Sequence, residues 1–365
     1  MHTAKLTGQP VAPFDADVLG SWQHQIGEAV RTKVPIVIVG GGTDPRPVSV
    51  RTDAAILSTA SWSGIVHHDP SEAIVTVRAG TTLEALATDL RRHGQMVPFQ
   101  PPRYGAGTTI GGAVARGLAG PSRPFAGAVR DAVLGVRIID GQGRRASFGG
   151  AVLKNVAGFD VPRLMTGARG TLGLLTEVTL RLVPIPAAVS TVRLVTTQSE
   201  AIERLNFLRG QPLPLSAGGW SKGVLYVRLA GATASVSRAV LAVGGEVIPD
   251  AVAREFWDRL RDQRLAAMTP DPGETVWRLS VRADAPAIDA PVVIDWAGWV
   301  RWVCVPVDVD LHAWSACNGG IARRVGQTAV PELPPVMARI HRRLRAVFDP
   351  AQILNRHIDF GEGTA

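Results

Sequence analysis

The sequence predicts an α+β protein with two domains and a short C-terminal tail. Over residues 30–185, short apolar segments that end in glycine alternate with amphipathic stretches, a pattern typical of strands and helices in mixed order. Pro184-Ile185-Pro186 is then predicted to be a linker, because proline interrupts both helices and sheet ladders. Seven of the nine tryptophans follow it, so composition changes there. We therefore expect domains over residues 1–185 and 186–335 and a tail over 336–365.

The first elements alternate strand and helix. An apolar strand is expected over residues 34–39, stopped by glycines, and a second over 73–78. A helix should begin near Thr81-Thr82, where a threonine can cap it, and end at Gly94.

Further strands are expected near residues 133–139 and 174–183. Asp140-Gly141 and Gly143 predict a hairpin turn that joins the strand at 136–139 to one at 145–148.

The composition excludes several classes of protein. No run of 18 apolar residues occurs, so no membrane span is expected. The first residues lack the apolar stretch of a secretory signal, which favours a cytoplasmic location. Cys304 and Cys317 are too few for a disulfide framework or for the four ligands of an iron–sulfur cluster. Both are predicted to be buried, unreactive thiols.

The net charge of +8 suggests nucleic acid as a partner, but its pattern does not. The arginines are scattered, without zinc-finger spacing or an aromatic RNA-binding pattern, so no nucleic-acid binding is expected. The densest cluster lies in residues 339–348, where arginines and apolar residues alternate with helical spacing. Its basic face either meets solvent or docks on an acidic partner subunit or an anionic membrane surface.

The first chemical signal is Gly40-Gly41-Gly42-Thr43, directly after an apolar strand. Glycines permit positive φ and bring backbone N–H groups close to a phosphate. A Rossmann motif would need its third glycine where Pro45 stands, and no Gly-Lys-Ser/Thr of a nucleotide phosphate loop follows. Alone, the triple glycine fits a phosphate-binding loop and a simple tight turn equally well.

Two further glycine signals follow. Thr108-Thr109-Ile110-Gly111-Gly112 opens a stretch of small residues, which suits a helix start packed against a flat or charged group, or against another helix. Gly170 and Gly173 lead into the strand at 174–183. Their backbone could reach the edge of an aromatic ring, although a plain helix-to-strand turn has the same pattern.

The order of these three signals resembles the FAD-binding domain shared by vanillyl-alcohol oxidase and p-cresol methylhydroxylase. The resemblance covers about residues 30–185 and the tail at 348–355, and its most specific stretches are 117–135 and 149–160. Within that family the chain is similar to the smaller flavin subunit of bacterial glycolate oxidases, which are glycolate dehydrogenases. The resemblance implies a two-subdomain FAD-binding domain of the vanillyl-alcohol-oxidase type plus a smaller α+β cap domain.

The same resemblance assigns residues to FAD. Those that would wrap the pyrophosphate are Gly40, Gly41, Gly42, Thr43 and Asp44. Those that would line the other side of the cofactor are Pro101, Pro102, Thr109, Ile110, Gly111 and Gly112. Those that would flank the ribityl chain and the flavin are Gly170, Gly173 and Leu175.

The resemblance also implies that FAD is held without a covalent bond. Some relatives attach FAD through a histidine beside the glycine loop, whereas here that neighbourhood is Thr43-Asp44-Pro45-Arg46. His67 and His68 are expected in an exposed polar loop.

Three departures from the family pattern bear on catalysis. Larger glycolate-oxidase flavin subunits and their D-lactate and D-2-hydroxyglutarate relatives carry a histidine-rich Gly-Asp-Gly-Asn motif for metal and substrate. This sequence has no such motif, so no metal site is expected, and catalysis by this chain alone is not implied. Residues 319–322 read Gly-Gly-Ile-Ala in place of Gly-Gly-His-Ala, and Asn355 precedes Arg356 in place of Pro-Gly.

The implied reaction moves hydride from the α-carbon of a small 2-hydroxy acid to FAD and passes electrons to an iron–sulfur partner subunit. A larger flavin subunit would complete the complex, which could sit peripherally at the inner face of the membrane through these partners. The catalytic residues are unknown. Lys154, Asn155 and Arg301 are candidates for carboxylate clamp or base, and each also fits an ordinary role as a surface lysine, a capping asparagine or a packed arginine.

Two other functions stay open at this point. One is a stand-alone FAD-dependent oxidase or dehydrogenase of another hydroxy acid or alcohol. The other is a non-catalytic flavin subunit with a structural or electron-relay role.

Overall fold

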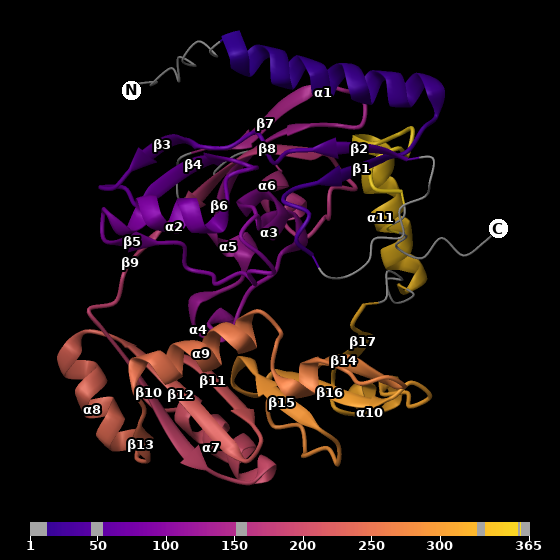
Figure 1. The fold of residues 1–365 in the computed structure, drawn as a ribbon. Helices are drawn as coiled ribbons and strands as arrows, with labels where there is room; N and C mark the ends of the chain where they lie inside the picture. Colours follow the sequence, from indigo (N-terminus) through magenta and orange to yellow (C-terminus); the bar gives the residue numbers. More distant parts are fainter. Residues whose placement is uncertain (1–12, 45–53, 151–158, 327–332, 357, 359–365) are drawn as a thin grey trace.

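Two antiparallel sheets dominate the molecule (Figure 1). The computed structural model describes residues 13–44, 54–150, 159–326, 333–356 and 358. One sheet has five strands in the order β3-β4-β8-β6-β7, and the other has eight in the order β13-β10-β12-β11-β15-β16-β14-β17. We refer to residues 13–185 with the tail 333–358 as the five-stranded half, and to residues 188–326 as the eight-stranded half.

The five-stranded sheet packs against helices to form the first hydrophobic core. Its strands are β3 (Ile65–Asp69), β4 (Ile74–Arg78), β6 (Val133–Ile139), β7 (Arg145–Gly149) and β8 (Leu174–Arg181). The helices packed into this core are α2 (Leu83–Arg91), α3 (Ile110–Arg116), α5 (Val129–Ala132) and α6 (Val161–Met165). Buried Val75, Leu86, Ile110 and Val178 share this core. The short helix α4 (Arg123–Ala126) instead packs its Phe125 against the core of the eight-stranded half. The predicted hairpin is confirmed, because β6 and β7 pair in antiparallel register around the turn at 140–144.

A smaller parallel pair lies beside this sheet. β1 (Ile36–Val39) pairs with β2 (Ala55–Ser58), and α1 (Pro13–Thr32) covers them with Trp22 and Ile26 (Figure 1). The chain returns here at its other end, after α11 (Pro335–Phe348), where Leu354 forms a parallel bridge to Ile36. The first strand is therefore flanked by an early segment on one side and by the tail on the other.

The eight-stranded half is built on all-antiparallel pairs. Its strands are β10 (Ala188–Val195), β11 (Leu215–Ser221), β12 (Val224–Gly231), β13 (Glu246–Val247), β14 (Glu274–Ser280), β15 (Val292–Asp295), β16 (Val300–Pro306) and β17 (Ile321–Arg324). Its helices are α7 (Gln198–Arg209), α8 (Thr233–Val243), α9 (Asp250–Arg261) and α10 (His312–Cys317), with short 3₁₀ turns η1 (Ala266–Met268) and η2 (Trp296–Gly298). α9 lies between this sheet and the five-stranded half (Figure 1).

Several local predictions differ from the structure in detail. The predicted linker begins inside a ladder, because β9 (Val183–Pro184) pairs with β5 (Gln95–Met96). A proline is tolerated there because the pair is only two residues long and lies at an edge. The chain changes sheet between β9 and β10, where a domain boundary was expected, and the three-part domain division stays a prediction.

Two side-chain predictions are corrected. His67 and His68 lie on strand β3 and not in a loop, and His68 Nε2 is 2.9 Å from Gln95 Oε1. Cys304 is buried as expected, but Cys317 is exposed at the end of α10 because its helix lies on the surface.

The amphipathic tail helix is confirmed as α11. Its Arg339, Arg342 and Arg343 are exposed, whereas Arg345 is buried and donates to the Leu354 carbonyl at 2.9 Å. Within the described ranges, no helix is both long and apolar enough to cross a membrane.

Candidate cofactor site

A cavity of about 320 Å³ opens in the five-stranded half, where the three glycine segments meet. This volume lies in the range of ordinary ligand pockets. Every residue that the sequence assigned to FAD lines it, with the exception of Ile110. The Ile110 side chain is fully buried in the core beneath the cavity. The structure therefore brings the predicted set together, while contact of each residue with FAD stays a prediction.

The first glycine loop is pressed against the segment that precedes α3. A Cβ on Gly41 would lie 1.6 Å from the Gly107 carbonyl oxygen, and one on Gly40 would lie 2.5 Å from Thr109 Oγ1. Gly42 has a φ of +65°, which favours glycine. Thr43 Oγ1 and Thr108 Oγ1 are 2.8 Å apart and join the two loops. Only residues without side chains fit this wall, so the cavity presents backbone there.

The second segment forms the start of α3. Thr109 caps this helix, because its Oγ1 accepts a hydrogen bond from Gly112 N at 3.2 Å. Gly111 N donates to the Ala79 carbonyl at 2.9 Å, and a Cβ on Gly111 would lie 2.6 Å from Ala79 Cβ. Glycine at 111 thus lets the helix approach strand β4 closely enough to close the cavity floor.

The third segment is held by a residue from the tail. Asn355 Oδ1 accepts from Ile38 N at 2.8 Å, and Asn355 Nδ2 donates to the Arg169 carbonyl at 2.5 Å. A Cβ on Gly170 would lie 2.6 Å from Asn355 Nδ2. Asn355 is itself buried and has a φ of +43°. The sequence showed Asn355 only as the last residue of the matched tail, before a departure at Arg356, and assigned it no role.

The charged side chains that line the cavity carry a net positive charge. Arg116 at the end of α3 forms an ion pair with Asp44, and Arg169 also lines the cavity. Burial and the nearby positive charge of Arg169 lower the pKa of Arg116 to about 10, so it stays protonated at neutral pH. Two arginines against one aspartate suit an anionic ligand, such as the diphosphate of a dinucleotide.

These features fit FAD. Close-packed glycines expose backbone to a phosphate, the arginines add positive charge, and apolar Leu118, Leu174 and Leu175 supply walls for a ring. Among the described residues that line the cavity, none is a histidine or a cysteine.

The catalytic candidates lie elsewhere or outside the described chain. Lys154 and Asn155 fall outside the described residues. Arg301 on β16 has no exposed surface and does not line the cavity. Its guanidinium donates to the carbonyls of Gly298, Ala285 and Ala283, the last two at 3.3 and 3.4 Å, and burial lowers its pKa to about 10. This environment is that of a packed arginine.

A second polar cluster, missed from sequence, surrounds Asp295 at the end of β15. Asp295 is buried, accepts from Trp296 N at 2.7 Å, and burial raises its pKa to about 6. Two arginines stack on the Trp296 ring. The guanidinium carbon Cζ lies 4.3 Å from the ring centroid for Arg123 of α4 and 4.7 Å for Arg278 of β14. Trp296 and Ala297 both have φ near +50°, which is unusual for residues with side chains.

No group of three or more histidine, cysteine or carboxylate side chains with metal-site geometry occurs in the part of the chain that the structure describes.

The chain is similar in sequence to known FAD-binding proteins. A family described as an FAD binding domain matches residues 22–149, which include the first two glycine segments. The chain is 40% identical over 340 residues to glycolate oxidase subunit GlcE of Escherichia coli, covering 91% of this chain and 94% of that protein. The chain belongs to the GlcE family. The predicted resemblance and FAD as the cofactor are thereby confirmed, and the chain is an FAD-dependent oxidoreductase of the class that acts on CH–OH groups.

More distant relatives match the flavin part. A D-lactate dehydrogenase of Archaeoglobus fulgidus is 32% identical over 152 residues, 41% of this chain and 34% of that protein. Glycolate oxidase subunit GlcD of Bacillus subtilis is 30% identical over 161 residues, 44% of this chain and 34% of that protein. The chain thus covers about a third of these longer relatives.

A solved alkyldihydroxyacetonephosphate synthase superposes with a TM-score of 0.66 and 16% identity, over 95% of this chain and 76% of that one. At that identity the likeness concerns the fold alone. Together with the matching FAD binding domain, it confirms the predicted α+β fold with an FAD-binding domain.

Proposed function

We propose that this chain is the FAD-binding subunit of a glycolate, or related 2-hydroxy-acid, dehydrogenase complex. The observation that carries the proposal is the similarity to GlcE over almost the whole of both chains, combined with a glycine-walled cavity where the sequence assigns FAD. Alignment of one domain alone would support FAD binding but not the subunit type. Here the eight-stranded half is included in the match.

FAD, when bound, supplies the redox chemistry by accepting a hydride from the α-carbon of the hydroxy acid as a base takes the hydroxyl proton. The chain's own residues would bind the FAD and orient it. Gly40–Gly42 and Gly111–Gly112 offer backbone to the diphosphate, and Arg116, held by Asp44, adds positive charge beside it. Asn355 fixes the segment that would flank the flavin. The described lining holds no histidine or cysteine, which supports non-covalent attachment.

The partners belong to the proposal as well. Two cysteines, one buried and one exposed, do not supply the ligands of an iron–sulfur cluster, so onward transfer of electrons calls for a separate iron–sulfur subunit. A larger flavin subunit would complete the assembly, which would be cytoplasmic or at the inner face of the membrane.

One observation favours a second function, a flavin subunit that relays electrons without oxidising substrate itself. Among the described residues that line the cavity, the carboxylate of Asp44 is already paired with Arg116, and no histidine or lysine is present as a base. A catalytic base would normally lie within hydrogen-bonding distance of the substrate hydroxyl.

Anaerobic reduction separates the two functions. The purified chain is first tested for bound FAD, which should appear in the supernatant after acid precipitation if attachment is non-covalent. It is then mixed with glycolate or D-lactate, alone and after co-expression with a larger flavin subunit and a cysteine-rich subunit. Bleaching of the flavin in the isolated chain supports a catalytic pocket, and bleaching only in the complex supports the relay. A chain that takes up no FAD at all would contradict both.

A further inference from the structure

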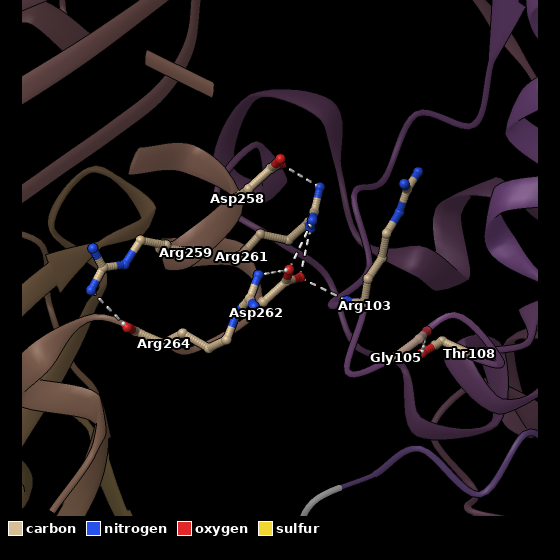
Figure 2. A network of polar contacts seen from close by, with 8 residues as sticks. All are labelled: Arg103, Gly105, Thr108, Asp258, Arg259, Arg261, Asp262 and Arg264. Carbon is tan, nitrogen blue, oxygen red and sulfur yellow. Dashed lines mark hydrogen bonds and ion pairs between the residues drawn. The ribbon is translucent and has the colours of Figure 1, made fainter. Parts of the chain in front are cut away.

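The wall of the cofactor cavity at Pro101-Pro102 is tied to the other half of the molecule. Both prolines are buried and line the cavity. Because proline has no N–H, neither residue can anchor this segment through its own amide. The first amide after them belongs to Arg103, and it donates to Asp262 Oδ1 at 2.8 Å (Figure 2). Asp262 follows α9 in the eight-stranded half.

The Asp262 carboxylate is held rigidly in place. It is 4% exposed, and Arg261 donates to both of its oxygens, from Nε to Oδ1 at 2.8 Å and from Nη2 to Oδ2 at 2.9 Å. Arg264 Nη2 adds a bond to Oδ2 at 3.0 Å. A two-point contact from an arginine fixes the direction of a carboxylate as well as its position (Figure 2). Asp262 therefore offers Arg103 an acceptor in one defined direction.

The segment that follows the prolines borders a second space. A second cavity of about 260 Å³ lies there, lined by Arg103, Thr108, Arg261 and Asp262 among others. Thr108 lines both this cavity and the cofactor cavity, so residues 103–108, which follow the prolines, lie between the two spaces. A wall with a space on each side depends on its few polar anchors more than a packed segment would.

The anchors near the prolines come from the eight-stranded half. Just before the prolines, Gln100 Oε1 accepts a hydrogen bond from Arg228 Nη2 on β12 at 3.0 Å. Just after them, the Arg103 amide donates to Asp262. The backbone also meets closely here, since a Cβ on Gly120 would lie 2.2 Å from the Gln100 carbonyl and 3.2 Å from Arg261 Cγ.

We propose that Asp262 is a positioning residue for FAD, acting through the Arg103 amide to set where Pro101 and Pro102 stand against the cofactor. This inference rests on the proposed FAD-binding role of the larger cavity. The eight-stranded half then tunes the flavin environment from outside the cavity, without contacting the cofactor through Asp262.

The test compares three variants. Asp262→Ala removes the acceptor, Arg103→Ala keeps the backbone N–H that donates to it, and Asp258→Ala removes a carboxylate that binds the same Arg261, at 2.7 Å, without touching the 100–104 segment. The measurements are the FAD dissociation constant of the apoprotein, the visible flavin spectrum and the flavin midpoint potential. We expect Asp262→Ala to weaken FAD binding about tenfold and to shift both spectrum and potential, since the bond from the Arg103 amide is lost together with the bonds from Arg261 and Arg264. Arg103→Ala and Asp258→Ala should leave all three unchanged.

Asp262→Asn guards against a failure to fold. It keeps the size of the side chain and one oxygen for the Arg103 amide, so it should fold, bind FAD within about threefold of the original chain and largely restore the spectrum. Unchanged FAD affinity and spectrum in a folded Asp262→Ala, or an equal loss in Asp258→Ala, overturns the inference. If the unaltered chain takes up no FAD, it is the proposed function that fails.

Discussion

Around the cofactor cavity the decisive polar atoms belong to the backbone, whereas the eight-stranded half buries charged side chains. Gly40, Gly41 and Gly111 leave no room for a Cβ and present main chain to the cavity. In the other half, Arg301 and Asp295 are almost entirely buried. A backbone site tolerates many changes nearby but few at its glycines. A buried charged side chain makes the fold sensitive to the loss of its partners instead.

The largest effect is expected from Arg301→Met. It leaves the carbonyls of Ala283, Ala285 and Gly298 without their donor inside the protein. We expect the free energy of unfolding to fall by roughly 3–5 kcal/mol, measured by urea denaturation, with FAD affinity of the folded fraction unchanged. Exposed Arg323→Met on β17 is the control and should be neutral. A stable Arg301→Met protein that binds FAD but has lost turnover would instead support the carboxylate-clamp role.

Next comes Gly41→Ala, which probes the backbone wall. The new Cβ would overlap the Gly107 carbonyl, so the two loops must separate. We expect FAD binding to weaken about a hundredfold, measured by quenching of flavin fluorescence. Gly27→Ala in α1 meets nothing within 4 Å and should bind FAD normally. Equal affinity in the two variants would show that the triple glycine is only a turn.

A pH effect tests the buried aspartate. Burial raises the pKa of Asp295 to about 6, so the folded state holds its proton more tightly than the unfolded state. That contribution is fully present below about pH 4 and is lost as the pH rises through 6, which amounts to roughly 2 kcal/mol. As the pH rises from 4 to 7, the free energy of unfolding should therefore fall by roughly 2 kcal/mol more in the unaltered chain than in Asp295→Asn. Parallel stability curves in urea would place the Asp295 carboxylate in a solvated site.

The smallest expected effect is at the tail. Asn355→Gly keeps the positive φ but removes the bonds to Ile38 N and the Arg169 carbonyl. We expect FAD affinity to fall about fivefold, measured by titration of apoprotein. Gln352→Gly is the matched control, since Gln352 is exposed and also has a positive φ. If both glycines behave alike, backbone freedom and not the amide group is responsible.

Local signals explain how much could be predicted. The glycine segments stand directly after strands or before a helix, and Thr82 caps α2 where a threonine start was expected. Such features depend on neighbours in sequence, so their pattern survives without knowledge of the fold.

What could not be predicted depends on distant partners. Asn355 binds Ile38 across 317 positions, and Asp262 binds Arg103 across 159. Asp262 stands in no pattern that distinguishes it from a surface aspartate, and Asn355 appeared only as the end of the matched tail, without a role. Trp296 has a positive φ that bulky residues avoid, and only the surrounding contacts in the folded molecule hold it there.

The return of residues 353–355 to β1 has a consequence for synthesis. The Ile353 carbonyl accepts from Ile36 N at 2.8 Å, and Asn355 N donates to the Ile36 carbonyl at 2.8 Å. A nascent chain on the ribosome exposes its first strand and its glycine loops long before it has made these residues. The cofactor cavity can take its final form only after residues 353–355 have been made and have paired with β1, so the early glycine loops alone do not complete it.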